Sequence, residues 1–191
     1  MDERTQLRRN DRAADETWIR EFLRETAVGV LATVHDGQPF VNSNIFVYDE
    51  GRSAIYLHTA RTGRTRDNVE SDPRAAFTVF ETGRLLPADE ALEFSIEYGG
   101  VVVFGSVAIV DEPREAEHGL QLLLDKYAPH LRPGRDYRPI TAGELKRTSV
   151  FRLDIETWSG KRKYVEPDFP GAYLYEDRER LAAEARADGE D

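Results

Sequence analysis

The chain has 191 residues, of which 40% are apolar and 32% charged, a composition typical of one globular domain. Its 36 acidic side chains outnumber the 26 basic ones and give a formal net charge of -10, which repels the phosphates of nucleic acid and anionic lipid. Because the chain has no cysteine, disulfide frameworks, thiolate metal sites, iron–sulfur clusters and cysteine nucleophiles are excluded. We therefore expect neither a nucleic-acid nor a membrane partner.

Residues 1–14 are polar and mixed in charge, without the apolar segment of a secretion signal. No stretch approaches the roughly 20 apolar residues of a membrane span. We predict a flexible N-terminal arm and a cytoplasmic protein. Asp15 then marks the start of a short amphipathic helix that ends near Ala27, because apolar side chains follow it at helical spacing.

Three β-rich runs come next, separated by turns that contain Asp-Gly or Glu-Gly. Glycine supplies the positive φ that tight hairpins need, so the pattern predicts an antiparallel meander. The runs cover residues 28–34, 40–48 and 53–58.

The remaining elements are strands with helices between them. A turn or two of helix is predicted near residues 66–70, and proline and leucine spacing predicts a helix between Pro113 and Pro129. Further predictions are strands at 74–81, 94–111 and 149–157, loops at 82–91 and 129–140, and a short helix at 141–147. The total is about six strands, which can close into a small barrel to remove exposed edges. We place one domain at 15–165 and a polar, acidic tail, either a solvated helix or a frayed end, at 166–191.

Residues 58–68 are the most informative segment, because three arginines and three threonines follow a strand end in an acidic chain. A helix N-terminus flanked by guanidinium groups is suited to a phosphate or pyrophosphate. The alternative is a solvated loop whose arginines pair with the nearby acids Asp67, Glu70 and Asp72.

Residues 158–163 are a second candidate, since Trp158 is followed by a turn and three cations. An aromatic ring and a nearby charge can hold a planar, anionic ligand. The alternative is the basic, solvent-facing end of a last strand.

Polar residues also interrupt the apolar strand at Asn42, Ser43 and Asn44. Polar groups that face a core need partners, which a heterocyclic ligand could supply. Alternatively, Asn42 and Asn44 face water, which leaves Ser43 facing inward with a backbone partner.

Familiar catalytic motifs are absent, including dinucleotide fingerprints, P-loops, zinc-protease helices and nucleophile elbows. The four histidines are scattered along the sequence, with none four residues from another. We therefore predict no metal site formed by protein side chains alone.

Four groups of residues together point to a known family. They are Val28–Thr33 with Asp36–Phe40, Ile55–Ala60 with Gly63, Arg64 and Asn68, Tyr98 with Val101–Gly105, and Leu145–Val150 with Trp158–Lys161. In this order and spacing the chain resembles the pyridoxamine 5'-phosphate oxidase-like, FMN-binding split-barrel superfamily, and within it the Nim-type branch of 5-nitroimidazole reductases.

The resemblance implies a mainly β fold, a six-stranded antiparallel split β-barrel with flanking helices. It also implies a homodimer with two flavin sites at the subunit interface, and an FMN phosphate in the segment from Thr59 to Asn68. The cofactor-binding residues it implies are Asn42, Ser43, Asn44, His58, Thr59, Ala60, Gly63, Arg64, Arg66, Asn68, Trp158 and Lys161. Two departures bear on the substrate: Gly99 and Gly100 stand where many relatives have arginine and serine, and Ser43 replaces a proline.

The function implied is a flavin-dependent oxidoreductase that takes electrons from a reduced nicotinamide and passes them to a small acceptor such as a nitroaromatic. His58 is the candidate catalytic residue, as a proton donor or polariser. FMN is the expected cofactor, with FAD as an alternative. Three further interpretations are the deazaflavin F420 bound along Lys161–Lys163, a haem- or flavin-binding carrier or sensor that uses His58 as ligand, and a barrel without a ligand.

Overall fold

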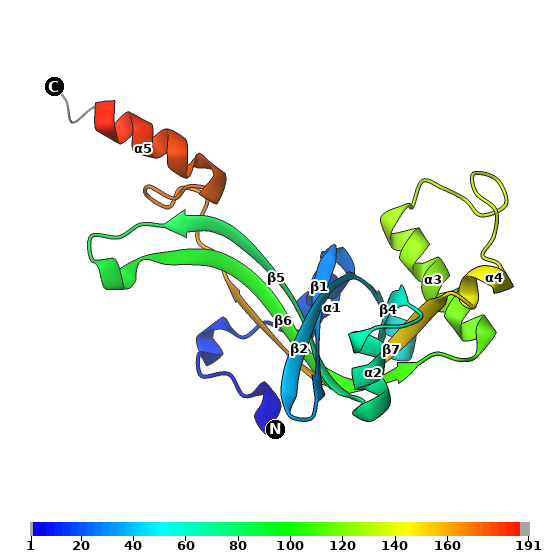
Figure 1. The fold of residues 1–191 in the computed structure, drawn as a ribbon. Coiled ribbons are helices and arrows are strands. Elements are labelled where there is room, and N and C mark those ends of the chain that lie inside the picture. Colours follow the sequence, from blue (N-terminus) through cyan, green and yellow to red (C-terminus); the bar gives the residue numbers. More distant parts are fainter. Residues whose placement is uncertain (1, 188–191) are drawn as a thin grey trace.

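The computed structural model describes residues 2–187 and shows a strongly curved antiparallel sheet with helices on its flanks (Figure 1). The strand order is β2-β1-β5-β6-β7-β4-β3, so the sheet is open, with β2 and β3 at its edges. Its seven strands are β1 (Val28–His35), β2 (Gln38–Ile45), β3 (Val47–Asp49), β4 (Ala54–Ala60), β5 (Arg74–Leu86), β6 (Ser95–Ile109) and β7 (Thr148–Lys163). The mainly β, antiparallel class with flanking helices is confirmed.

The expected count of six strands is one too low, because the run predicted over 40–48 forms two strands. β2 pairs with β1, whereas β3 pairs with β4 at the opposite edge of the sheet. Phe46 lies at the break, with a fully buried side chain, and its backbone amide donates to Tyr127 Oη at 3.0 Å. A partner from a distant helix therefore replaces a strand partner at this residue.

The central strands are longer than predicted, and the first half of the loop expected at 82–91 belongs to β5. Arg84 stabilises this extension, since its guanidinium pairs with Glu97 at 2.8 Å and also donates to backbone oxygens of residues 165–167. Arg84 and two backbone amides hold the pKa of Glu97 at about 2. As a result, β5 and β6 form a long hairpin that projects from the body of the protein (Figure 1).

The helices form close to the positions predicted from the capping residues and the apolar spacing in the sequence. Asp15 caps α1 (Glu16–Glu25) by accepting from the Trp18 amide, as predicted. The others are α2 (Arg64–Ser71), α3 (Pro113–Tyr127), α4 (Ala142–Leu145) and the exposed α5 (Arg178–Ala187). Within residues 2–187 no helix is both long and apolar enough to cross a membrane.

The apolar side chains form two cores on opposite faces of the sheet. The larger core lies in the concave face, where Leu31, Phe77 and Val103 pack with the buried side of α1. The smaller core lies between α3 and the β3–β4–β7 end of the sheet, around Tyr56 and Leu123. Full burial of each such side chain contributes about 1.5–3 kcal/mol, so both α1 and α3 are fixed by packing.

The convex face of β2, β1, β5 and β6 carries several exposed apolar side chains in the described part of the chain, and Leu7 of the N-terminal segment lines a depression in it beside Phe80. Phe80 is 65% exposed and Val41 63% exposed, and Val28 and Val102 lie on the same face by strand alternation and register. Contiguous exposed apolar side chains of this kind are typical of a protein–protein contact.

The N-terminal segment lies against β7. Arg4 pairs with Glu156 at 2.9 Å, and Ala13 forms an isolated bridge with Lys161. The segment predicted as a flexible arm therefore has specific contacts in this structure.

Candidate functional site

The end of β4 and the start of α2 form the centre of the site. β4 pairs with β7 as far as Ala60 and Thr148, and a short loop then leads to α2. Gly63 adopts a φ of 138°, a conformation that favours glycine, and no side chain caps the helix. The Arg66 amide donates to the Gly63 carbonyl at 2.9 Å, so the amides of Arg64 and Thr65 are the ones available to a bound anion.

One buried and one partly buried hydrogen bond fasten α2 to the β1–β2 hairpin. Asn68 Nδ2 donates to Thr33 Oγ1 at 2.9 Å, and Asn42 Nδ2 donates to Thr65 Oγ1 at 3.3 Å. Arg66 adds a third attachment, because it donates to Ser149 Oγ at 3.0 Å and pairs with Glu70 at 2.8 Å. Of the expected cofactor-binding residues, Asn42, Arg66 and Asn68 thus have partners within the fold and position the helix.

The other arginines of this segment are not neutralised by acids. Arg61 and Arg64 are exposed and form no ion pair within residues 2–187. The Arg64 guanidinium instead lies 4.9 Å from the centroid of the Phe40 ring. Asp72 pairs with Arg74, so the solvated-loop interpretation holds for Arg66 alone. Two free cations remain beside an uncapped helix N-terminus.

His58 lies on the opposite face of β4 from the larger core, beside a cavity of about 530 Å³. Its Nδ1 atom is buried without a hydrogen-bond partner, and burial lowers the pKa of the imidazole. A neutral imidazole with an unsatisfied nitrogen is therefore presented beside the cavity. The apolar lining residues are Ile45, Leu120, Leu123, Leu124, Ala128 and Ile140, with Tyr127 and Tyr137 beside them.

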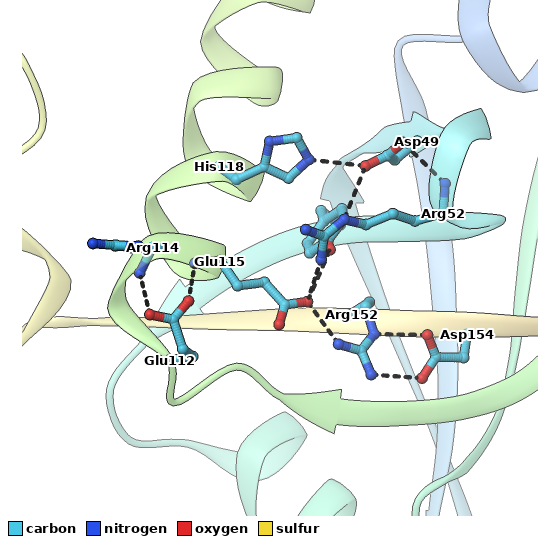
Figure 2. Close-up of polar contacts among 9 residues, drawn as sticks. Asp49, Arg52, Glu112, Arg114, Glu115, His118, Arg152 and Asp154 are labelled. Carbon is cyan, nitrogen blue, oxygen red and sulfur yellow. Dashed lines mark hydrogen bonds and ion pairs between the residues drawn. The ribbon is translucent and has the colours of Figure 1, made fainter.

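A polar network that the sequence did not reveal fixes α3, the wall of this cavity (Figure 2). Tyr56 Oη donates to Glu115 at 2.9 Å, and Arg152 joins Glu115 at 2.6 Å to Asp154. His118 Nε2 lies 2.9 Å from Asp49 Oδ2. These residues are separated by as many as 105 positions, the span from Asp49 to Asp154, so no local pattern connects them.

The C-terminal turn of α3 is anchored as well. Lys126 Nζ lies 3.9 Å from the Phe46 ring centroid and donates to the Thr26 carbonyl at 2.8 Å. Burial lowers the pKa of Lys126 to about 8. Together with Tyr127, whose hydroxyl donates to the Phe46 carbonyl at 2.9 Å, this turn closes one side of the cavity.

Trp158 and Lys161 do not join the other candidates within one chain. Both lie on β7, and Trp158 is eight residues beyond Val150, the partner of His58, which is roughly 26 Å along a strand. The partly buried Trp158 ring packs against the larger core, and the Arg20 guanidinium lies 5.0 Å from the ring centroid. Lys161 is directed instead toward Tyr98, 5.8 Å from its ring centroid.

The polar residues of β2 face the opposite way from the alternative in which Asn42 and Asn44 face water and Ser43 faces inward. Ser43 is exposed on the convex face, whereas Asn42 and Asn44 are half-buried toward α2. Asn44 Nδ2 donates to the Asn42 carbonyl at 3.1 Å. The inward asparagine amides therefore have partners inside the protein.

A family model described as pyridoxamine 5'-phosphate oxidase matches residues 15–162. The chain belongs to this family. The match covers β1 to β6, α2 and β7 as far as Arg162, so the resemblance to the pyridoxamine 5'-phosphate oxidase-like superfamily is confirmed. A comparison with curated proteins finds no match.

Solved structures share the fold of this pyridoxamine 5'-phosphate oxidase family member. The flavocytochrome Anf3 from Azotobacter vinelandii is 22% identical with a TM-score of 0.76, covering 91% of this chain and 84% of that one. An FAD and haem binding protein from Mycobacterium smegmatis is 22% identical with a TM-score of 0.71, covering 82% and 76%. A protein from Bacteroides thetaiotaomicron with a proposed role in 5-nitroimidazole antibiotic resistance is 15% identical with a TM-score of 0.66, covering 78% and 86%. At these identities the likeness shows a common fold.

Proposed function

We propose that this chain is a flavin-dependent oxidoreductase that passes electrons from a reduced nicotinamide to a small, uncharged acceptor. The observation that carries the proposal is the pair of unneutralised arginines, Arg61 and Arg64, beside the uncapped N-terminus of α2. In a chain with a net charge of -10, such a site favours the phosphate of a flavin. Membership of the family and flavin-binding neighbours of the same fold support it.

The residues present fit a flavin phosphate. The backbone amides of Arg64 and Thr65 would donate to phosphate oxygens, and the Arg64 guanidinium would add a charge-assisted pair. At Gly63 no atom lies within 4 Å of the position that a Cβ would take, so the approach to the helix is open. When bound, the flavin supplies the electron transfer, and the protein supplies position and charge.

His58 would act at the ring end of the site. Burial keeps its imidazole neutral near pH 7, so it can donate a hydrogen bond from one nitrogen and accept one at the other. The unsatisfied Nδ1 has no partner in residues 2–187 that would compete for this role. We assign His58 the role of polarising the acceptor through a hydrogen bond, because a neutral imidazole can donate a hydrogen bond but does not give up a proton near pH 7.

The acceptor would occupy the cavity beside His58. Its volume of about 530 Å³ and its leucine, isoleucine and tyrosine walls suit an uncharged aromatic molecule. A nitroaromatic compound, such as a 5-nitroimidazole, has this chemistry, and a neighbour of the same fold is associated with resistance to such compounds.

The active form would be a homodimer formed through the convex apolar face of β2, β1, β5 and β6. Burial of exposed side chains such as Phe80 and Val41 would supply the driving force. Lys161 lines a depression in this face with Phe80 and Val102, so it could reach a flavin site only on the partner copy.

Substitution of one exposed arginine tests the phosphate assignment. We expect Arg64→Ala to weaken FMN binding about tenfold, because it removes a charge-assisted contact. Arg8→Ala is the matched control, since Arg8 is also exposed and forms no ion pair within residues 2–187. Equal affinity for FMN in the two variants would show that the phosphate binds elsewhere.

Haem binding is a second candidate function, favoured by the unpartnered His58 nitrogen beside an apolar cavity. A neutral imidazole is the form that ligates iron, and an apolar wall suits a porphyrin. Titration with haemin would give a shifted Soret band that is lost in His58→Ala. An identical spectrum in that variant would remove His58 as the ligand.

A further inference from the structure

The cavity beside His58 has more polar groups in its lining than the proposed function uses. Several of them are satisfied inside the protein. Tyr127 Oη donates to the Phe46 carbonyl at 2.9 Å and accepts from the Phe46 amide at 3.0 Å. Arg138 donates two hydrogen bonds of 2.9 Å each to the Glu144 carboxylate. The groups that keep a hydrogen-bonding position to spare are the buried His58 nitrogen and the hydroxyls of Tyr137 and Thr148.

The hydrogen bonding of Tyr137 is fixed by a glutamine on α3. Gln121 Nε2 donates to Asp125 Oδ1 at 2.7 Å and to Tyr137 Oη at 3.0 Å. Because a carboxylate only accepts hydrogen bonds, Asp125 determines that the nitrogen of the Gln121 amide, and not its oxygen, lies at this point. Tyr137 Oη is therefore an acceptor in the bond with Gln121. Its own hydrogen forms no bond within residues 2–187 and is free to be donated.

The free hydroxyl and the free imidazole nitrogen reach the same cavity from different elements. His58 lies on β4, and Thr148 is its diagonal neighbour on β7, about 7–8 Å away on the same face of the sheet. Tyr137 comes from the loop between α3 and α4, and its side chain is half-buried. A molecule that fills the cavity therefore meets one polar group from the sheet and another from this loop.

We propose that Tyr137 is a specificity-determining residue of the acceptor site, and that its hydroxyl donates to an oxygen atom of the bound molecule. The inference rests on the proposed function, because it concerns the acceptor in the cavity beside His58. A nitro or carbonyl oxygen accepts such a bond, whereas an alkyl group of the same shape leaves the hydroxyl without a partner. The cavity then selects uncharged aromatic molecules that carry an oxygen acceptor. Gln121 is a positioning residue, since it holds Tyr137 Oη in the orientation that leaves the hydrogen free.

Two probes of nearly the same shape, nitrobenzene and isopropylbenzene, test this assignment by binding alone. Each is titrated calorimetrically into the full chain, with and without FMN. We expect Tyr137→Phe to weaken nitrobenzene binding about tenfold and to change isopropylbenzene binding less than about threefold. Tyr175→Phe is the matched control, because Tyr175 is exposed and does not line the cavity. It should bind both probes as the wild-type protein does.

Substitutions at position 121 test the direction of the hydrogen bond. Gln121→Glu introduces a carboxylate that would accept the hydrogen of Tyr137, so this variant should lose nitrobenzene affinity as Tyr137→Phe does. Gln121→Lys keeps a donor toward Tyr137 and should bind nitrobenzene within about threefold of the wild-type affinity. An equal effect of the two substitutions would overturn the positioning role of Gln121.

The probe pair separates hydrogen bonding from packing. An equal loss of affinity for both probes in Tyr137→Phe would overturn the proposal, because the side chain would then act through its shape. Nitrobenzene binding that is unchanged in this variant, or undetectable in the wild-type protein, would overturn it as well. These outcomes leave the flavin site at α2 intact. A chain that binds nitrobenzene through Tyr137 but binds no flavin would instead overturn the proposed function alone.

Discussion

The side-chain amide of Asn68 donates a hydrogen bond of 2.9 Å to the hydroxyl of Thr33, and both side chains are almost completely buried. This bond joins α2 to β1 and thereby fixes the helix N-terminus where Arg64 and the free amides lie. A buried polar pair of this kind is costly to break, because the partner that remains is left without a hydrogen bond.

We therefore expect Asn68→Ala to lower the free energy of unfolding by about 1–3 kcal/mol and to weaken flavin binding as α2 loses its attachment. Urea unfolding and flavin titration measure the two effects. Thr33→Val serves as the partner control. The double variant should lose less stability than the sum of the single variants, and strict additivity would mean that the two side chains do not interact.

The position of α3 depends on the absence of a side chain at Gly119. A Cβ there would lie 2.7 Å from Tyr56 Cδ1, closer than atoms pack. Gly119→Ala should therefore destabilise the protein by about 1–3 kcal/mol and alter the cavity beside His58. Gly143→Ala is the control, since its nearest neighbour would be 3.9 Å away; that variant should be unchanged or slightly stabilised. Equal stabilities of the two variants would contradict the packing described.

The buried state of His58 predicts a pH dependence of stability. Burial lowers its pKa below the usual value of 6.5, so the unfolded chain binds a proton more readily than the folded one. The contribution of His58 is complete above the unfolded pKa and is lost as the pH falls toward the folded pKa. The free energy of unfolding should be lower at about pH 5.5 than at about pH 7.5, with a smaller difference in His58→Gln. An unchanged difference would place His58 in solvent.

Many local elements could be predicted from the sequence, because their determinants are close neighbours. Asp15 and Pro113 mark the starts of α1 and α3, and the Asp-Gly turn joins β1 to β2. The break between β2 and β3 at Phe46 could not be predicted from the sequence, because its backbone amide donates to the hydroxyl of Tyr127, which is distant in the sequence. The extension of β5 to Leu86 could not be predicted for the same reason, because Arg84 pairs with Glu97 and with the backbone after β7.

The site was predicted in part for similar reasons. The segment from His58 to Asn68 lies together as expected, because it is continuous in the sequence. Trp158 was linked to this segment only by family resemblance, and the length of β7 places it, partly buried, against the larger core beside Arg20. The cavity walls on α3 and α4 had no local signal, since they depend on helix packing.

The convex apolar face predicts a concentration-dependent dimer. Phe80→Arg should shift the protein toward monomer in sedimentation velocity, because a charge would be buried in the contact. Leu92→Arg is the control, as Leu92 is 89% exposed at the tip of the β5–β6 hairpin. If both variants behave like the wild-type protein, the dimer uses another surface or does not form.

The most direct test of the flavin site at α2 is a fluorescence titration of the purified chain with FMN and FAD, made in parallel on Arg64→Ala. We predict saturable, equimolar flavin binding by the wild-type protein and a clear loss of affinity in the variant. Absence of saturable binding of either flavin to the wild-type chain would contradict the proposed function.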